Sequence, residues 1–168
     1  MVPGNKPADK RTANAKEGNM KKAVLFYYSV HHGNTKKIAE AIAGQFDVTL
    51  VRVPVKETID LDEYDLVGFA SGIYMSEFGK PIRELAGSLE KLGGKDCFTI
   101  YTCGAAAGKF DGGFQKRLTG RGARIAGGFH CRGYDTFGPF KLVGGIAKGR
   151  PNKADEARAV AFFSDLLK

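Results

Sequence analysis

Apolar runs and amphipathic stretches alternate along the chain from Lys22 onward. Residues 23–29 form an unbroken apolar and aromatic run, which is typical of a strand buried on both faces. Residues 65–72 are predicted as a second buried strand. Residues 48–53 alternate apolar with polar side chains, which indicates a more exposed strand. Further strands are predicted at residues 97–102 and 124–131.

Apolar residues at helical spacing occupy the stretches between most of these strands. From Ile38 they recur every four positions, which gives one apolar helix face. Pro81 suits the first turn of the next helix, and Gly93 follows its expected end. Asn152 is a candidate cap for the last helix. The predicted helices cover residues 35–46, 81–92, 111–118 and 151–167.

The order of these elements predicts the fold class. Strands and helices alternate, apart from one short connection between the second and third strands, and this alternation predicts a parallel sheet covered by helices on both faces. A TIM barrel needs about 250 residues, whereas this chain has 168. We therefore expect one α/β domain with a doubly wound, five-stranded parallel sheet in three αβα layers.

The N-terminal segment and the cysteines bear on domain limits and location. Residues 1–19 are polar and lack a periodic apolar pattern, so we predict a disordered extension or expression leader before a domain at residues 20–168. No apolar run approaches the roughly 18 residues that a membrane span needs. Cys97, Cys103 and Cys131 form neither a CxxC pair nor a disulfide framework, which favours a cytoplasmic location.

The chain is basic, with 26 Lys and Arg residues against 18 Asp and Glu residues and a net charge of +8. Such a charge favours acidic partners, anionic substrates or nucleic acid, unless it only keeps the protein soluble. Four basic residues crowd the third predicted helix and its exit: Lys116, Arg117, Arg121 and Arg124. They form either a docking face for an acidic redox partner or a solvated surface. We find no helix-turn-helix, zinc knuckle or RRM signature, so no nucleic-acid partner is predicted.

The chemistry of an open parallel sheet is expected beyond the carboxyl ends of its strands, where the strand order reverses. The turn after the first strand carries hydroxyls at both ends and a glycine that lets the backbone approach a ligand. The free N–H groups of the following helix favour an anion by roughly 0.3 to 1 kcal/mol, or up to ~2 kcal/mol when partly buried. The alternative is that the hydroxyls only cap the helix and the histidines lie on the surface. This candidate phosphate loop is Ser29, Val30, His31, His32, Gly33, Asn34 and Thr35.

A family resemblance rests on this loop and the residues around it. The sequence Tyr28-Ser29-Val30-His31-His32-Gly33-Asn34-Thr35-Lys36-Lys37-Ile38-Ala39 resembles the phosphate loop and first helix of the flavodoxin family, in which hydroxyls and backbone amides hold the FMN phosphate. In element order the resemblance covers residues 22–168. It implies a flavodoxin-like fold and FMN as the cofactor. Because the family also includes protoporphyrinogen oxidases and quinone reductases, it fixes the cofactor better than the reaction.

The resemblance extends to the turn after the second buried strand. Ser71, Gly72, Ile73 and Tyr74 correspond to the loop that packs an aromatic ring on the flavin, a contact typically worth ~0.5 to 1.5 kcal/mol beyond area burial. Alternatively, the tyrosine covers the apolar base of its own loop. Many flavodoxins have Gly after this aromatic residue, and a flexible peptide there turns its carbonyl toward the flavin. Met75 makes the required positive φ costly, which favours two-electron chemistry.

The third turn implied by the resemblance contains Thr102, Cys103, Gly104 and Ala105, whose backbone amides would wrap the edge of the flavin. We interpret the cysteine as a small packing residue rather than a redox group, because no neighbouring charge pair stabilises a thiolate. Residues 131–140 are too aromatic for a simple linker. We expect them to cover the end of the sheet, with a cap over a substrate pocket as the alternative.

We therefore predict an FMN-binding electron-transfer protein whose partner is a redox protein or a small-molecule electron acceptor. The alternative is an FMN-dependent oxidoreductase acting on a quinone, a porphyrinogen or NAD(P)H. A third class is a flavin-free interaction module on the same fold, although the strand ends lack the carboxylate of a receiver domain. No catalytic acid or base and no metal-ligand motif is predicted.

Overall fold

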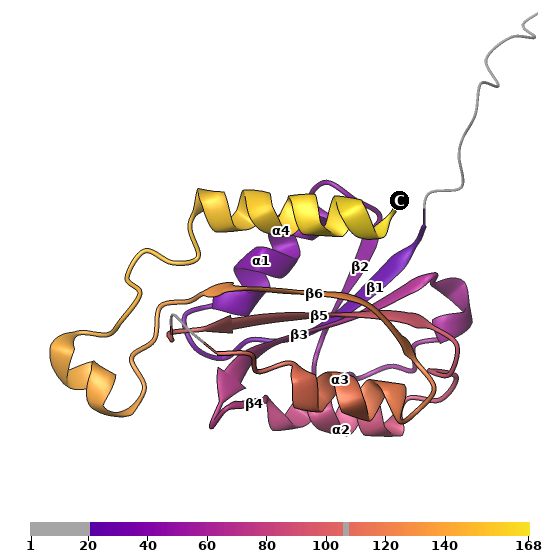
Figure 1. The fold of residues 1–168 in the computed structure, drawn as a ribbon, viewed down its shortest axis with the longest axis horizontal. Coiled ribbons are helices and arrows are strands. Elements are labelled where there is room, and N and C mark those ends of the chain that lie inside the picture. The colour runs from indigo at the N-terminus through magenta and orange to yellow at the C-terminus, as the bar shows by residue number, and fades with distance from the viewer. Residues whose placement is uncertain (1–20, 106–107) are drawn as a thin grey trace, which may run out of the picture.

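The computed structural model describes residues 21–105 and 108–168, and the extension predicted at residues 1–19 lies outside these ranges. Its central sheet has the order β2-β1-β3-β5-β6, with neighbouring strands parallel. The predicted doubly wound, five-stranded parallel sheet is therefore confirmed (Figure 1). The five strands are β1 (Ala23–Tyr28), β2 (Val48–Arg52), β3 (Leu66–Tyr74), β5 (Asp96–Cys103) and β6 (Arg124–Arg132).

Helices cover both faces of the sheet, which confirms the three-layer αβα arrangement (Figure 1). On one face lie α1 (Asn34–Ala43) and α4 (Lys153–Leu166); on the other lie α2 (Lys80–Ser88) and α3 (Gly112–Thr119). Alternate residues of β1 point to opposite layers. Leu25 packs with Ile38 of α1 in one apolar core, whereas Phe26 packs with Ile82 of α2 in the other. Two 3-10 helices complete the elements, η1 (Leu61–Glu63) and η2 (Gly138–Val143).

The end of α2 differs from its prediction. The helix stops at Ser88 instead of residue 92, because Leu89 turns to an extended conformation with φ −60° and ψ 125°. Lys91 then takes a positive φ of 58°. Leu92 is still buried, so the apolar spacing that predicted a helix marks burial rather than helical backbone. The first helix likewise ends at Ala43 rather than at residue 46.

A hairpin missing from the sequence prediction extends β3. Strand β4 (Glu77–Phe78) pairs antiparallel with the end of β3, and Met75 and Ser76 form the two-residue connection. Both have positive φ, 50° and 66°, as in the type I′ turn that matches the twist of a hairpin. Met75 thus adopts the left-handed conformation that we expected to be costly for it, because a two-residue hairpin connection requires it.

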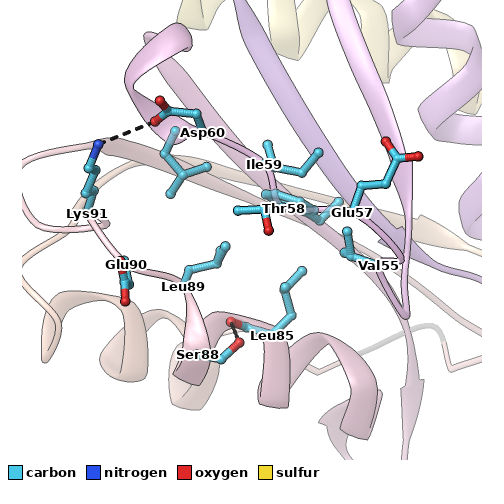
Figure 2. A pocket seen from close by; sticks show the side chains of 12 residues that line it. Val55, Glu57, Thr58, Ile59, Asp60, Leu85, Ser88, Leu89, Glu90 and Lys91 are labelled. Carbon is cyan, nitrogen blue, oxygen red and sulfur yellow. Dashed lines mark hydrogen bonds and ion pairs between the residues drawn. The ribbon is translucent and has the colours of Figure 1, made fainter.

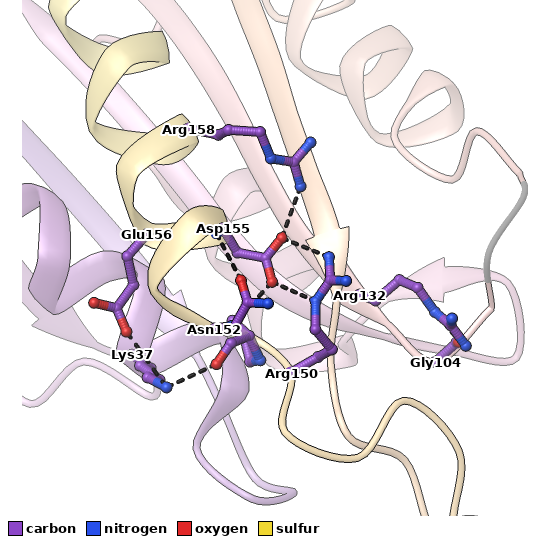
Figure 3. A network of polar contacts seen from close by, with 9 residues as sticks. Lys37, Gly104, Arg132, Arg150, Asn152, Asp155, Glu156 and Arg158 are labelled. Atoms are coloured by element: carbon purple, nitrogen blue, oxygen red, sulfur yellow. Dashed lines mark hydrogen bonds and ion pairs between the residues drawn. The ribbon is translucent and has the colours of Figure 1, made fainter.

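A buried carboxylate fixes the start of α4. Asp155 is almost fully buried and accepts hydrogen bonds from Arg150 and Arg158 (Figure 3). Asn152 accepts a hydrogen bond from the Asp155 amide, and the Asp155 carboxylate accepts one from the Asn152 amide, which forms a capping box. The predicted cap at Asn152 is therefore confirmed.

Candidate functional site

A cavity of about 280 Å³ lies at the carboxyl ends of the central strands. It is lined by all three turns that the sequence singled out. Because the carboxyl ends of parallel strands meet at one edge of the sheet, turns that are far apart in sequence converge there. The predicted residues in its lining are Ser29, Val30, His31, Asn34, Thr35, Gly72, Ile73, Tyr74, Thr102, Cys103 and Gly104.

Four of the predicted site residues lie outside this lining: His32, Gly33, Ser71 and Ala105. Ser71 is fully buried; its hydroxyl donates to the Gly72 carbonyl and accepts from the Gly79 amide at 2.8 Å. It therefore holds the β3–β4 hairpin. The ring of His32 forms a 3.0 Å hydrogen bond with the Thr136 hydroxyl. Gly33 serves as the N-cap residue of α1.

In the part of the chain that the structure describes, the first turn contains backbone donors without a partner at the start of α1. Its residues His32 and Gly33 have φ values of 56° and 66°, and such left-handed backbone is uncommon outside glycine. Within residues 21–105 and 108–168, the N–H groups of His31, His32 and Gly33 have no hydrogen-bond partner. Helix α1 also begins without a side-chain cap in this part of the structure. The alternative in which the hydroxyls of Ser29 and Thr35 cap the helix is therefore not what the geometry shows.

Hydrogen bonds tie the first turn to two other segments. The hydroxyls of Thr35 and Thr102 lie 2.8 Å apart, and both residues are buried. The side-chain amide of Asn34 donates to the Tyr134 carbonyl at 2.8 Å. A Cβ atom at Gly133 would lie 2.6 Å from the Asn34 amide nitrogen, so only glycine allows this approach. The walls of the cavity thus hold one another in place.

Tyr74 is half-buried at the cavity wall. Its hydroxyl lies 3.0 Å from where a Cβ atom of Gly72 would stand, so the ring folds back over its own strand. The rings of Tyr28 and His31 are each 5.9 Å from it, centroid to centroid. Burial raises the pKa of the Tyr74 phenol, with the nearby Tyr28 and Asp135 adding to this and a hydrogen bond from the Val30 backbone opposing it. The phenol is therefore neutral at physiological pH.

The segment after β6 forms a fourth wall of the cavity, as in the alternative in which residues 131–140 cap a pocket rather than only cover the end of the sheet. Gly133, Tyr134, Asp135 and Phe137 line the cavity, as does Met75 from the hairpin. The wall is braced internally, since the Asp135 carboxylate accepts from the Phe137 amide at 2.8 Å. The aromatic content of residues 131–140 was the available signal.

Gly104 and Cys103 form the floor next to this wall. A Cβ atom at Gly104 would lie 2.7 Å from Asp135. The glycine therefore permits a close approach between the third turn and the fourth wall of the cavity. Burial raises the pKa of the Cys103 thiol, and its sulfur lies 3.5 Å from the Ala105 carbonyl oxygen. The protonated thiol agrees with a packing role. Arg132 donates to the Gly104 carbonyl at 3.1 Å and fixes this turn (Figure 3).

The cavity offers an anion neutral donors rather than cationic side chains. None of its described lining residues is Lys or Arg, and Asp135 is the one carboxylate among them. An anion at this site would therefore be held by backbone N–H groups, hydroxyls and the uncapped end of α1. This set of donors suits a phosphate group that must be bound without strong charge pairing.

A larger cavity of about 510 Å³ lies beside α2 and is lined by the loop that precedes η1 (Figure 2). Its lining combines apolar side chains such as Leu85 and Leu89 with the carboxylates of Glu57, Asp60 and Glu90. Lys91 pairs with Asp60 at 3.6 Å at its edge. None of the three predicted turns contributes to this cavity, so the candidate chemistry remains in the smaller one.

Residues 25–133 match the model of the flavodoxin domain. An uncharacterized protein of Methanocaldococcus jannaschii is 36% identical over 149 residues, covering 88% of this chain and 99% of that protein. A flavoprotein from Lactobacillus acidophilus, solved in complex with FMN, has a TM-score of 0.54 at 21% identity, over 66% of this chain and 93% of its own. A flavodoxin from the domain Archaea has a TM-score of 0.59 at 17% identity, over 87% and 96%. Both solved structures share the fold.

Proposed function

The chain belongs to the flavodoxin family, and on that premise we propose that it binds FMN in the 280 Å³ cavity and uses the flavin to transfer electrons. The observation that carries the proposal is the start of α1, where the N–H groups of His31, His32 and Gly33 have no partner in the described part of the chain. Unpaired donors at the start of a helix favour an anionic ligand.

The residues present fit FMN at both ends of that molecule. The first turn would receive the phosphate, with the buried hydroxyls of Thr35 and Thr102 behind it. Tyr74 and the third turn would contact the isoalloxazine ring, for which an apolar and aromatic wall is suitable. When bound, FMN would supply the electron transfer itself, and the protein would supply binding, orientation and a set potential.

Titration of the flavin-free protein tests this proposal. We expect FMN to bind more tightly than riboflavin by about tenfold or more, because only FMN carries the phosphate. Quenching of flavin fluorescence gives both dissociation constants. Colour in the purified protein, and release of FMN on denaturation, would be independent support. Failure to take up FMN would contradict the proposal and leave the flavin-free interaction module.

A second candidate, an FMN-dependent oxidoreductase with a small-molecule substrate, is favoured by one observation. Met75 and Ser76 both have positive φ in a two-residue hairpin connection. A flip of the peptide bond between Met75 and Ser76 would convert this connection to a type II′ turn, whose first central position is normally glycine. Met75 resists that change, so the peptide motion expected of a one-electron carrier is disfavoured. The three free cysteines fit the proposed cytoplasmic location.

Two further features bear on partners. No helix within the described residues is long and apolar enough to cross a membrane. Separately, we propose a redox protein or a small molecule as the electron-exchange partner, and the distribution of basic side chains distinguishes these two.

A further inference from the structure

A third cavity, of about 270 Å³, lies between the β3–β4 hairpin and helices α2 and α3. Three cationic side chains line it, Arg83, Lys109 and Arg117, against the single carboxylate of Glu77. We call this cavity the basic cleft. Its lining thus carries excess positive charge, in contrast to the neutral donors of the proposed flavin site. A concave, cationic surface of this size suits the anionic group of a small molecule.

Arg83 has an unused hydrogen-bond donor at this cleft. One terminal nitrogen of its guanidinium pairs with the Glu77 carboxylate at 2.7 Å. Its Nε atom is buried and has no partner among residues 21–105 and 108–168. A buried donor without an acceptor is rare in native structures. The Arg83 side chain as a whole is 29% exposed, so an oxyanion in the cleft can reach the guanidinium group, and its planar geometry is well suited to phosphate and carboxylate groups.

At the start of α3, the N–H groups of Gly112 and Gly113 have no hydrogen-bond partner within residues 21–105 and 108–168. Asp111 is the N-cap residue of α3 but makes no side-chain cap bond; its carboxylate instead accepts from Gln115 at 3.0 Å. The first turn of α3 holds no acidic residue, and Gly113 in that turn lines the basic cleft. The helix dipole therefore adds to the field of the three cations there.

The wider basic surface does not form one docking face. Arg124 pairs with Asp96 at 2.7 Å, and Arg121 donates to the Leu89 carbonyl at 2.7 Å. Of the four basic residues that the sequence grouped together, Arg117 lines the cleft, while Lys116 beside it is exposed and outside the lining. The structure thus favours a concave site for a small molecule over a broad face for an acidic protein.

We propose that the basic cleft binds the oxyanion group, phosphate or carboxylate, of the small molecule with which the protein exchanges electrons. This inference rests on the proposed function. It places the anionic end of the substrate next to the flavin site, because Met75 lines the proposed flavin cavity and the next residue, Ser76, lines the cleft. It favours phosphate- or carboxylate-bearing substrates such as reduced pyridine nucleotides over neutral quinones.

Titration of inorganic pyrophosphate into the FMN-loaded protein, and of succinate as the carboxylate probe, tests the site. Bound FMN blocks the first turn, so the loaded protein reports on the cleft. We expect NMR shifts at the Arg83 Nε–H and at the Gly113 amide. Arg117→Gln should weaken binding about tenfold or more, whereas Lys116→Gln, which removes the same charge from the same helix, should change it less than about twofold. Equal losses of anion affinity in the two variants would show only general attraction to a basic surface and would overturn the site. The absence of NMR shifts at Arg83 and Gly113 would also overturn it.

A kinetic experiment tests the substrate class. Arg117→Gln should raise the apparent dissociation constant for NADPH in flavin reduction about tenfold, while the rate of electron transfer to an uncharged benzoquinone stays unchanged. If Arg117→Gln slows the reactions with NADPH and with benzoquinone equally, the cleft does not bind the anionic group of the substrate. An effect of this variant only on electron transfer to an acidic redox protein would also overturn the proposal. Failure of the flavin-free protein to bind FMN would instead refute the proposed function. Pyrophosphate-induced NMR shifts at Gly113 can be measured in that same protein, so the anion site can be tested even if FMN does not bind.

Discussion

The hydroxyl oxygen of Thr35 lies 2.8 Å from that of Thr102, and both side chains are buried. This hydrogen bond joins the first turn of α1 to the end of β5. It is one of the direct links between the first and third turns of the proposed flavin site. It therefore connects the stability of the fold to the shape of the cavity.

Substitution of either threonine by valine should destabilise the protein. Thr35→Val or Thr102→Val leaves the other hydroxyl buried without its partner, which typically costs ~1 to 3 kcal/mol. The double variant should cost less than the sum of the two, because it removes both polar groups at once. Urea unfolding of the four proteins measures the coupling. Strictly additive losses would contradict a direct hydrogen bond.

Gly33→Val should separate phosphate binding from ring binding. Gly33 has a φ of 66°, and a Cβ atom there would meet nothing within 4 Å, so the cost is backbone strain of roughly 1 to 2 kcal/mol. FMN affinity should fall about tenfold or more, with riboflavin affinity nearly unchanged. Gly94→Val is the matched control, since Gly94 has a φ of 79° in open space before β5. Similar losses for FMN and riboflavin would argue against the first turn as the phosphate site.

Met75→Gly should change how the bound flavin accepts electrons. Glycine at the first central position allows the hairpin peptide to turn over, so two distinct one-electron steps should replace a single two-electron step. Stepwise reduction followed by visible absorption distinguishes these outcomes. Ser76→Gly alters the neighbouring position of the same turn and should leave the single step intact. If Met75→Gly has no effect, the conformation of this turn does not control the chemistry.

Asp155 should make stability depend on acid pH. Burial alone would raise its pKa, but hydrogen bonds from Arg150, the Asn152 amide and Arg158 outweigh burial and hold the pKa at about 2, against an ordinary value of 3.8. The stabilisation is thus complete above about pH 4 and lost as the pH falls toward 2, in total about 2 kcal/mol. Urea unfolding as a function of pH measures it.

The matched variants for that measurement are Asp155→Asn and Asp165→Asn. Asp155→Asn should flatten the acid dependence and cost ~1 to 3 kcal/mol at neutral pH, because it removes the charge-assisted hydrogen bonds to Arg150 and Arg158, whose side chains are themselves 32% and 58% exposed. Asp165 is exposed and pairs with Lys168, so its substitution should have little effect. An unchanged pH profile in Asp155→Asn would assign the acid dependence to other groups.

The three thiols should differ in reactivity toward an alkylating reagent. Burial raises the pKa of Cys97 and of Cys131 to about 12, whereas Cys103 is only half-buried and lines the proposed flavin cavity. Cys103 should therefore react first, and FMN should slow its modification. Mass spectrometry of the labelled protein identifies the site, with Cys103→Ser as the control. Labelling of Cys97 before Cys103 would contradict the burial that we describe.

The fold was largely predictable because burial leaves a periodic record in the sequence. Strands β1 and β3 are covered on both faces and appear as apolar runs. The same apolar pattern gave a wrong end for α2. Leu92 keeps the helical spacing and is buried, but it lies in the loop after the helix. Strand β4 has two residues, too few to produce any pattern.

The site was predicted directly where it follows from strand ends, whereas the fourth wall was predicted only as the less favoured alternative. Three turns meet because parallel strands align their carboxyl ends, and a sequence shows which turns follow strands. The fourth wall reaches the cavity through tertiary hydrogen bonds, from His32 to Thr136 and from Asn34 to Tyr134. No local pattern encodes such contacts. The basic cleft was missed because its cations come from α2, from α3 and from the loop between β5 and α3.

The span of these cross-links has a consequence for biosynthesis. The hydrogen bond between Thr35 and Thr102 bridges 67 positions of the chain, and that between Asn34 and Tyr134 bridges 100. A nascent polypeptide still lacking Phe137 cannot close the cavity, however well its earlier strands have paired. The complete lining of the proposed ligand site can therefore form only after that residue has emerged from the ribosome.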